Sequence, residues 1–98
     1  MNNDLFFMER AYKQALLGFN KDEIPVGAVV VYKNEIISEA HNESIVNKDP
    51  TAHAEIVAIR KAALKIGNYR LTNAKMFVTL EPCLMCCGAL IHARFDKV

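Results

Sequence analysis

Two short motifs of metal-ligating residues, far apart along the chain, constrain its fold more than any other feature. The first motif holds His53 and Glu55, and the second holds Cys83 and Cys86, separated by two residues and preceded by a Glu-Pro pair. Zinc prefers nitrogen and sulfur ligands in tetrahedral geometry, and a catalytic zinc site has three protein ligands and an open fourth position. We therefore expect the fold to bring His53, Cys83 and Cys86 together around zinc, with Glu55 beside it to transfer protons.

A closed structural zinc site is the first alternative, and it would need a fourth ligand. Cys87 directly follows Cys86, so on a helix it would point about 100° away. His41 and His92 are the other candidate ligands, and neither has a usual zinc-ligand spacing from the three. A redox pair made by the two motif cysteines is a second alternative, but it would leave the His-x-Glu motif unexplained.

The composition fits a single globular domain over residues 1–98, with 52% hydrophobic and 23% charged residues. No apolar run approaches the ~20 residues of a membrane helix, and the N-terminus lacks the basic segment of a signal peptide. We therefore expect a cytoplasmic protein without membrane contact, whose three cysteines serve metal binding or catalysis rather than disulfides. Because the formal net charge is only +1, any contact with RNA would depend on a local basic patch.

Hydrophobic periodicity in the N-terminal half predicts a helix followed by a β-hairpin. Residues 4–20 predict an amphipathic helix, with Asp4 capping its start. Residues 24–32 form a nearly continuous apolar run, which predicts a strand buried on both faces. Residues 35–41 predict the second strand of the hairpin. The apolar stripe expected to bury the helix consists of Leu5, Met8, Tyr12, Ala15, Leu16 and Phe19.

The C-terminal half predicts a helix, a strand and a further helix, which completes the order α-β-β-α-β-α. The helix over residues 51–66 is expected to begin at Thr51 as N-cap and to end at Gly67. Its predicted apolar stripe consists of Ile56, Ile59, Ala63 and Ile66. The remaining elements are a strand over 75–80, a helix over 83–94 that Glu81 is expected to cap, and the first step of another strand over 96–98.

Both motifs lie at predicted helix starts, where ligand sites form in open α/β sheets. The positive end of a helix dipole there favours the thiolate form of cysteine, which is the form that binds zinc. One difficulty concerns His53 and Glu55, which an ideal helix would turn about 200° away from each other. Their meeting at one site therefore depends on irregular backbone at the helix start.

These motifs resemble the cytidine and deoxycytidylate deaminase superfamily, and within it the bacterial tRNA adenosine deaminases. The resemblance covers essentially all 98 residues. The Asn-Tyr-Arg-Leu and Thr-Leu-Glu-Pro-Cys stretches favour the tRNA enzymes, whereas Asp-Pro-Thr-Ala-His-Ala-Glu is shared with guanine deaminases. The matching stretches are 23–29, 41–42, 49–55, 68–71 and 79–89.

The resemblance implies a three-layer α/β/α cytidine-deaminase-like fold whose last strands and helices are missing from this chain. It implies one zinc ion per chain, held by His53, Cys83 and Cys86, with Glu55 as the proton shuttle. It implies hydrolysis of adenosine to inosine at the wobble position of tRNA anticodons, with the tRNA anticodon stem-loop as partner and a homodimer as the assembly. The implied substrate-binding residues are Asn42, Ala54 through its backbone, Pro25 and Val26.

Two other functions stay open on the sequence. One is deamination of a free nucleobase or nucleoside, such as guanine or cytosine. The other is an inactive zinc-binding fragment of a deaminase, because relatives continue past Val98 with two further strands and C-terminal helices. The strand over 75–80 is accordingly expected to be an open edge, and apolar surfaces beside it are expected to be bare.

Overall fold

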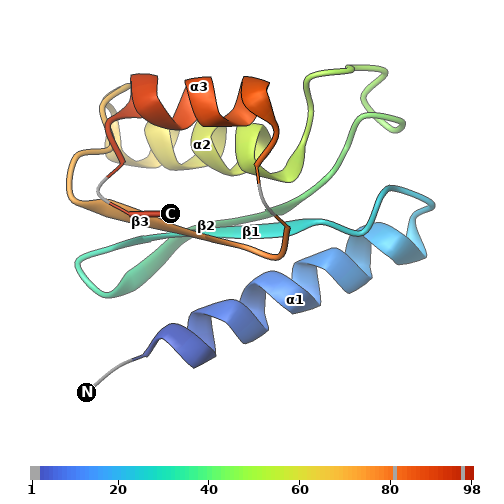
Figure 1. Ribbon diagram of the computed structural model, residues 1–98, viewed down its shortest axis with the longest axis horizontal. Helices are drawn as coiled ribbons and strands as arrows, with labels where there is room; N and C mark the ends of the chain where they lie inside the picture. The colour runs from blue at the N-terminus through green and yellow to red at the C-terminus, as the bar shows by residue number, and fades with distance from the viewer. Residues whose placement is uncertain (1–2, 81, 96) are drawn as a thin grey trace.

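The computed structural model describes residues 3–80, 82–95 and 97–98. A three-stranded sheet lies between one helix on one face and two helices on the other (Figure 1), which confirms the predicted three layers and element order. None of the described helices is long and apolar enough to cross a membrane. The elements are α1 (Asp4–Asn20), β1 (Gly27–Tyr32), β2 (Glu35–His41), α2 (Ala54–Ile66), β3 (Ala74–Val78) and α3 (Leu84–Ala93).

β1 is the centre of the sheet, and it runs antiparallel to β2 on one side and to β3 on the other. Its side chains alternate between the two faces: Val29 and Val31 pack under α1, whereas Val30 packs under α2 and α3. This confirms the predicted burial on both faces, although the strand begins at Gly27, three residues later than predicted. β2 and β3 are therefore parallel to each other, and α2 connects them as the predicted crossover.

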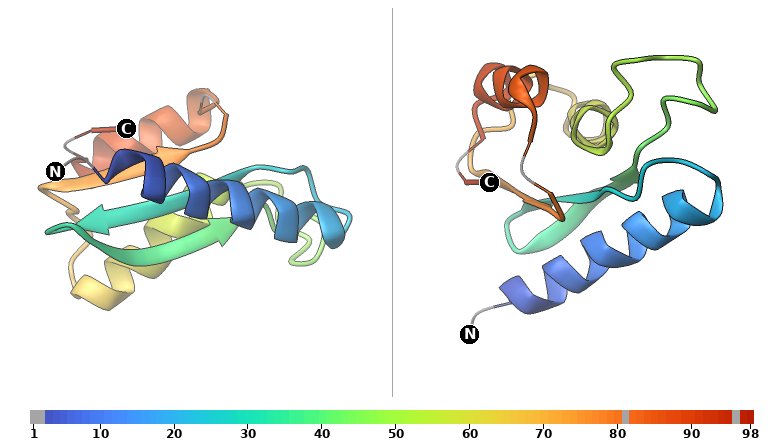
Figure 2. Two further views of the ribbon diagram at one scale, coloured as in Figure 1. Left: turned by 90° about the horizontal axis from the view of Figure 1, so that it is seen from below. Right: turned by 45° about the vertical axis from the view of Figure 1, so that its right-hand side comes forward.

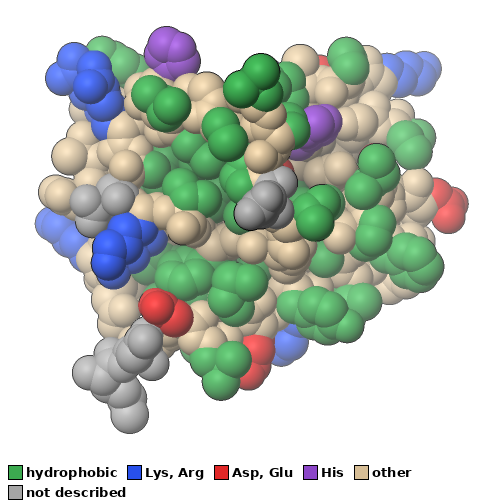
Figure 3. Space-filling model, viewed as in Figure 1, with side chains coloured by type: hydrophobic (Ala, Val, Ile, Leu, Met, Phe, Trp, Pro, Cys, Tyr) green, Lys and Arg blue, Asp and Glu red, His purple; other side chains and the backbone are tan. Residues whose placement is uncertain are grey.

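α1 packs on the sheet through a face rotated from the predicted one. Its buried residues are Phe7, Ala11, Ala15 and Gly18, of which Ala15 belongs to the predicted stripe. The helix lies so close to β1 that a Cβ added to Gly27 would come 1.9 Å from the carbonyl oxygen of Ala11, so small residues occupy the contact. Large residues of the predicted stripe stay exposed along α1 (Figure 3), namely Leu5, Met8, Tyr12, Leu16 and Phe19. The predicted cap is also wrong, because Asn3 holds the N-cap position and Asp4 is the first helical residue.

α2 begins three residues later than predicted, because Thr51 belongs to a turn. Its N–H and its hydroxyl both donate to Oδ1 of Asp49, at 2.9 and 2.7 Å. His53 takes the N-cap position instead, with extended backbone at φ −69° and ψ 156°. The predicted end is confirmed: Gly67 is left-handed at φ 79°, and its N–H donates to the Ala63 carbonyl at 2.8 Å.

The sheet-facing side of α2 is again lined by small residues. Ala54, Ala58 and Ala62 are fully buried at a spacing of four, and they make a face rotated from the predicted stripe. Ile59 and Ala63 of that stripe pack at the margin of the core. The remaining two are less buried: Ile56 is half-buried and Ile66 is exposed. Figure 2 shows α2 and α3 side by side on the face of the sheet opposite α1.

α3 runs from Leu84 to Ala93, with Cys83 as its N-cap, and is thus one residue shorter at each end than predicted. After it, Lys97 forms an isolated parallel bridge with Lys75, and its carbonyl accepts the Met76 N–H at 2.9 Å. This bridge agrees with the predicted first step of a further strand along β3. The predicted cap Glu81 and the predicted strand residue Asp96 lie outside the described residues.

Candidate functional site

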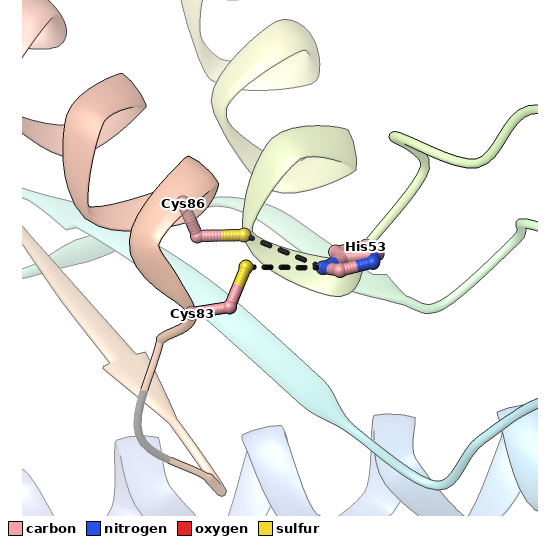
Figure 4. Close-up of side chains that lie close together, drawn as sticks. All are labelled: His53, Cys83 and Cys86. Carbon is pink, nitrogen blue, oxygen red and sulfur yellow. Dashed lines mark hydrogen bonds between the residues drawn. The ribbon is translucent and has the colours of Figure 1, made fainter.

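The predicted zinc ligands come together where α2 and α3 begin (Figure 4). Nδ1 of His53 lies 3.6 Å from Sγ of Cys83 and 3.7 Å from Sγ of Cys86. All three ligand atoms lie within 4.8 Å of one another. In the part of the chain that the structure describes, this is the one group of three or more potential ligands at such distances.

The separations fit tetrahedral zinc. With Zn–S near 2.3 Å and Zn–N near 2.0–2.1 Å, a sulfur and a nitrogen ligand lie about 3.6 Å apart. The structure offers no fourth ligand among the described residues. Cys87 is exposed, with its Sγ 3.6 Å from the Pro82 carbonyl, His41 contacts the Asn42 carbonyl, and His92 is exposed on α3. A three-ligand set is typical of catalytic rather than structural zinc.

The two cysteine ligands have opposite environments. Backbone N–H groups at the start of α3, foremost that of Cys86, lower the pKa of Cys83. Burial raises the pKa of Cys86 to about 12, and the negative charge of Glu55 adds to this. A cation at the three ligand atoms would offset both burial and repulsion, because a coordinating thiol loses its proton outright.

Glu55 lies in the first turn of α2 and is only 4% exposed. It lines the same pocket, of about 190 Å³, as His53 and Cys83. The difficulty with helical spacing disappears, because the N-cap His53 lies outside the helix that holds Glu55. Among the described residues no donor binds the carboxylate of Glu55, so it is available to a ligand in the pocket.

Asn42 lines this pocket from the end of β2. Its Oδ1 accepts a hydrogen bond from the N–H of Ala54 at 2.7 Å, and both residues are buried. The bond assigns the oxygen end of the amide to the backbone, so the NH₂ end is the one left for a ligand. Asn42 thus already engages the N–H of Ala54, and the contact of the Ala54 backbone with a substrate stays a prediction.

The remaining pocket walls are apolar. Val26 lines the pocket as predicted, whereas Pro25 lines an adjoining groove under α1. Ile24 and Leu80 also line the pocket, and sequence reasoning did not single them out. Both lie inside the stretches that carry the family resemblance, 23–29 and 79–89, and this position is the signal that could have identified them.

Comparison with known proteins shows what this arrangement is similar to. Residues 1–98 match the family model of the cytidine and deoxycytidylate deaminase zinc-binding region. Two curated relatives named tRNA-specific adenosine deaminase come from Haemophilus influenzae and Buchnera aphidicola, at 52% identity over 94 residues and 48% over 97 residues. The alignments cover 95% and 99% of this chain but 52% and 60% of those relatives, so the chain spans only part of their length.

Two solved structures have the same fold, each with a TM-score of 0.94. One, from work on A-to-I editing by tRNA deaminases at the wobble position of transfer RNA, is 41% identical and covers 96% of this chain and 72% of that chain. The other is a guanine deaminase from Bacillus subtilis, which is 42% identical and covers 100% of this chain and 62% of that chain. The predicted cytidine-deaminase-like fold is therefore confirmed.

Proposed function

This chain belongs to the cytidine and deoxycytidylate deaminase family, and from that premise we propose that it is the zinc-binding part of a hydrolytic tRNA adenosine deaminase. In the proposed reaction, water adds at the amino-bearing carbon of adenine and ammonia leaves, which converts adenosine to inosine at the wobble position. The observation that carries this proposal is a single pocket that places a buried carboxylate and an amide donor beside the three-ligand set.

Zinc, when bound, lowers the pKa of a water molecule toward ~7 and so supplies a nucleophile at neutral pH. Glu55 is proposed to move the protons. It lies in the first turn of α2 and lines the same pocket as two of the zinc ligands, His53 and Cys83. As a carboxylate it accepts a proton from the attacking water and delivers it to the ring nitrogen. It then accepts the second proton from the hydroxyl group added to the base and passes it to the departing amine, so that ammonia leaves.

Asn42 is proposed to orient the base. Because its Oδ1 is held by Ala54, its NH₂ presents a donor with a fixed direction to an acceptor on the base. Ile24 and Val26 supply apolar walls that restrict water around the reacting atoms. Pro25 is proposed to contact the substrate at the rim, since it lies in the adjoining groove rather than in the pocket.

The relatives named tRNA-specific adenosine deaminase favour a tRNA anticodon stem-loop as substrate. An anticodon loop suits this chemistry, because its bases are unpaired and leave the stack at low cost. The second candidate is deamination of a free base or nucleoside such as guanine or cytosine. One specific observation favours guanine: the guanine deaminase structure matches this fold with the same TM-score as the tRNA deaminase structure.

We further propose a cytoplasmic homodimer with one zinc ion per chain. Support for self-association comes from apolar side chains on the outer surfaces of α2 and α3, where Leu64 is 84% exposed, Leu84 is 90% exposed and Ile91 is 74% exposed. A helix layer that presents such residues to solvent is typical of a surface that contacts another protein.

The test measures zinc content and inosine formation on the same purified chain, with an anticodon stem-loop carrying adenosine at the wobble position. We expect one zinc per chain and inosine in the stem-loop, but no product from free adenosine, guanine or cytosine. Glu55→Ala is expected to abolish turnover and to retain zinc. Turnover of free guanine instead would favour the second candidate, and zinc without any turnover would make the chain an inactive deaminase fragment.

A further inference from the structure

Glu23 is a buried carboxylate to which the proposed chemistry gives no role. It is 5% exposed, in the segment between α1 and β1. Both of its oxygens accept the N–H of Ile45, each at 3.2 Å, and Oε2 also accepts the N–H of Val46 at 2.9 Å. A buried carboxylate is costly unless it is hydrogen-bonded, so these two N–H groups are what makes Glu23 tolerable there.

The two N–H groups belong to the tip of the loop over residues 43–52. This loop begins directly after Asn42 and ends directly before His53. Its ends are joined by a bond from the Glu43 N–H to the Ala52 carbonyl at 2.8 Å. Within the described residues, the other hydrogen bond from the loop to a neighbouring element is the exposed Arg60–Asp49 ion pair at 3.4 Å. The Glu23 carboxylate is thus the buried tether of this loop.

Glu23 also leads directly into a second segment that lines the pocket. Its own N–H donates to the Gly18 carbonyl at 3.0 Å, which anchors it to the end of α1. The next residues along the chain include Ile24 and Val26, which line the pocket together with Asn42. The buried Glu23 side chain therefore connects the segment over 23–26, which lines the pocket with apolar residues, to the loop over 43–52, which follows Asn42.

We propose that Glu23 is a positioning residue, which sets the width of the base pocket by holding the loop over 43–52 against the segment over 23–26. This inference rests on the proposed function, because it assigns that pocket to a nucleobase. Releasing the tether would let Asn42 move away from Ile24 and Val26 while the three zinc ligands stay in place. Glu23 would then control how tightly the base binds rather than the chemical step.

The test compares Glu23→Gln and Glu23→Ala with the same two changes at Glu39. Glu39 is a matched control, because it accepts two hydrogen bonds from Arg10 at 3.2 and 2.7 Å and ties α1 to β2 without lining the pocket. The first measurement is amide hydrogen exchange. In Glu23→Ala we expect exchange about tenfold faster at Ile45 and Val46, and also at Ala54, whose N–H reports on Asn42.

The second measurement is steady-state deamination of the stem-loop. Glu23→Ala is expected to raise KM about tenfold with kcat within about twofold and zinc content unchanged, and Glu23→Gln, which keeps one acceptor oxygen, to rescue part of the loss. Unchanged exchange at Ala54, an equal rise of KM in the Glu39 variants, or a loss confined to kcat would overturn the inference. If the chain shows no turnover, hydrogen exchange alone tests the inference. If the Ala variants do not fold, the comparison of Glu23→Gln with Glu39→Gln tests it.

Discussion

Asn42 serves the fold with one end of its amide and the proposed chemistry with the other. Asn42→Ala removes the acceptor of a buried N–H at Ala54, which should lower the free energy of unfolding by about 1–3 kcal/mol. Asn42→Asp keeps the acceptor, but it replaces the NH₂ donor with a carboxylate oxygen and adds a negative charge to the pocket that Glu55 also lines. Because the Ala54 N–H keeps its partner, Asn42→Asp should lose less stability than Asn42→Ala. Chemical denaturation separates the two variants.

Both Asn42 variants are expected to lose deamination of the stem-loop, because neither can donate to the base. The pair therefore distinguishes a folding role from a binding role at one position. Full activity in Asn42→Asp would contradict the proposed donor, and equal instability of the two variants would contradict the role of Oδ1.

Asp49, in the turn before α2, is expected to make the free energy of unfolding depend on pH. Hydrogen bonds from the Thr51 hydroxyl and N–H lower the pKa of Asp49 below its usual value. A carboxyl whose pKa is lower in the folded state stabilises the fold above its unfolded pKa, and this contribution is lost as the pH falls through the folded pKa. The free energy of unfolding should therefore decrease below about pH 4. Urea denaturation between pH 3 and pH 7 should show a smaller decrease in Asp49→Asn, and equal slopes would contradict this.

The same turn shows why the ligand set was predictable from the sequence and its local geometry was not. The identity of His53, Cys83 and Cys86 follows from what zinc accepts as ligands, whatever the fold. The position of His53 outside α2 depends on which group the Thr51 hydroxyl binds. As an N-cap, Thr51 would have accepted a hydrogen bond from a backbone N–H in the first turn of the helix. Instead, its hydroxyl donates to the Asp49 carboxylate two residues earlier, and this bond stabilises a turn.

At the scale of elements, β1 and its hairpin were predictable because apolar runs and turns are local signals. The buried faces of α1 and α2 were not, because their prediction weighted large apolar residues. Close approach to the sheet selects small ones: Ala11 and Gly18 on α1, and Ala58 and Ala62 on α2. The distance between a helix and a sheet depends on the tertiary structure, so local sequence patterns do not reveal it. Gly27 on β1 is the residue opposite α1 whose missing side chain makes this close approach possible.

Gly27 provides the test of this close packing. A methyl group added there would meet backbone atoms of α1 at 1.9 and 2.6 Å, and backbone cannot rotate away as a side chain can. Gly27→Ala should therefore lower the free energy of unfolding by about 1–3 kcal/mol or more. Gly88→Ala is the matched control, since nothing lies within 4 Å of the added carbon and alanine favours helix by about 1 kcal/mol. Denaturation midpoints should shift in opposite directions, and a harmless Gly27→Ala would mean that α1 lies farther from β1.

At the scale of the whole molecule, the site lies where several element ends converge. β2 ends at His41 beside Asn42, β3 leads through Leu80 toward Cys83, and α2 and α3 both begin there. In a sheet with crossover connections, the carboxyl ends of parallel strands are where ligands bind. Among the described residues, the candidate site thus lies at the end of the sheet where the chain leaves both outer strands and where α2 and α3 begin.

Because its ligands come from the starts of α2 and α3, zinc is expected to link these helices and to stabilise the entire fold. A metal that binds only the folded chain stabilises it by about 2.7 kcal/mol when its free concentration is a hundred times the dissociation constant. The denaturation midpoint should therefore rise with buffered zinc and fall with a chelator. Cys86→Ser should abolish this dependence, whereas Cys87→Ser should preserve it, because the thiol of Cys87 faces the Pro82 carbonyl rather than the ligand set. If both variants lost the zinc dependence of the midpoint equally, zinc would bind the cysteines without the geometry of the site. If the midpoint of the parent chain did not depend on zinc, the metal would not stabilise the fold.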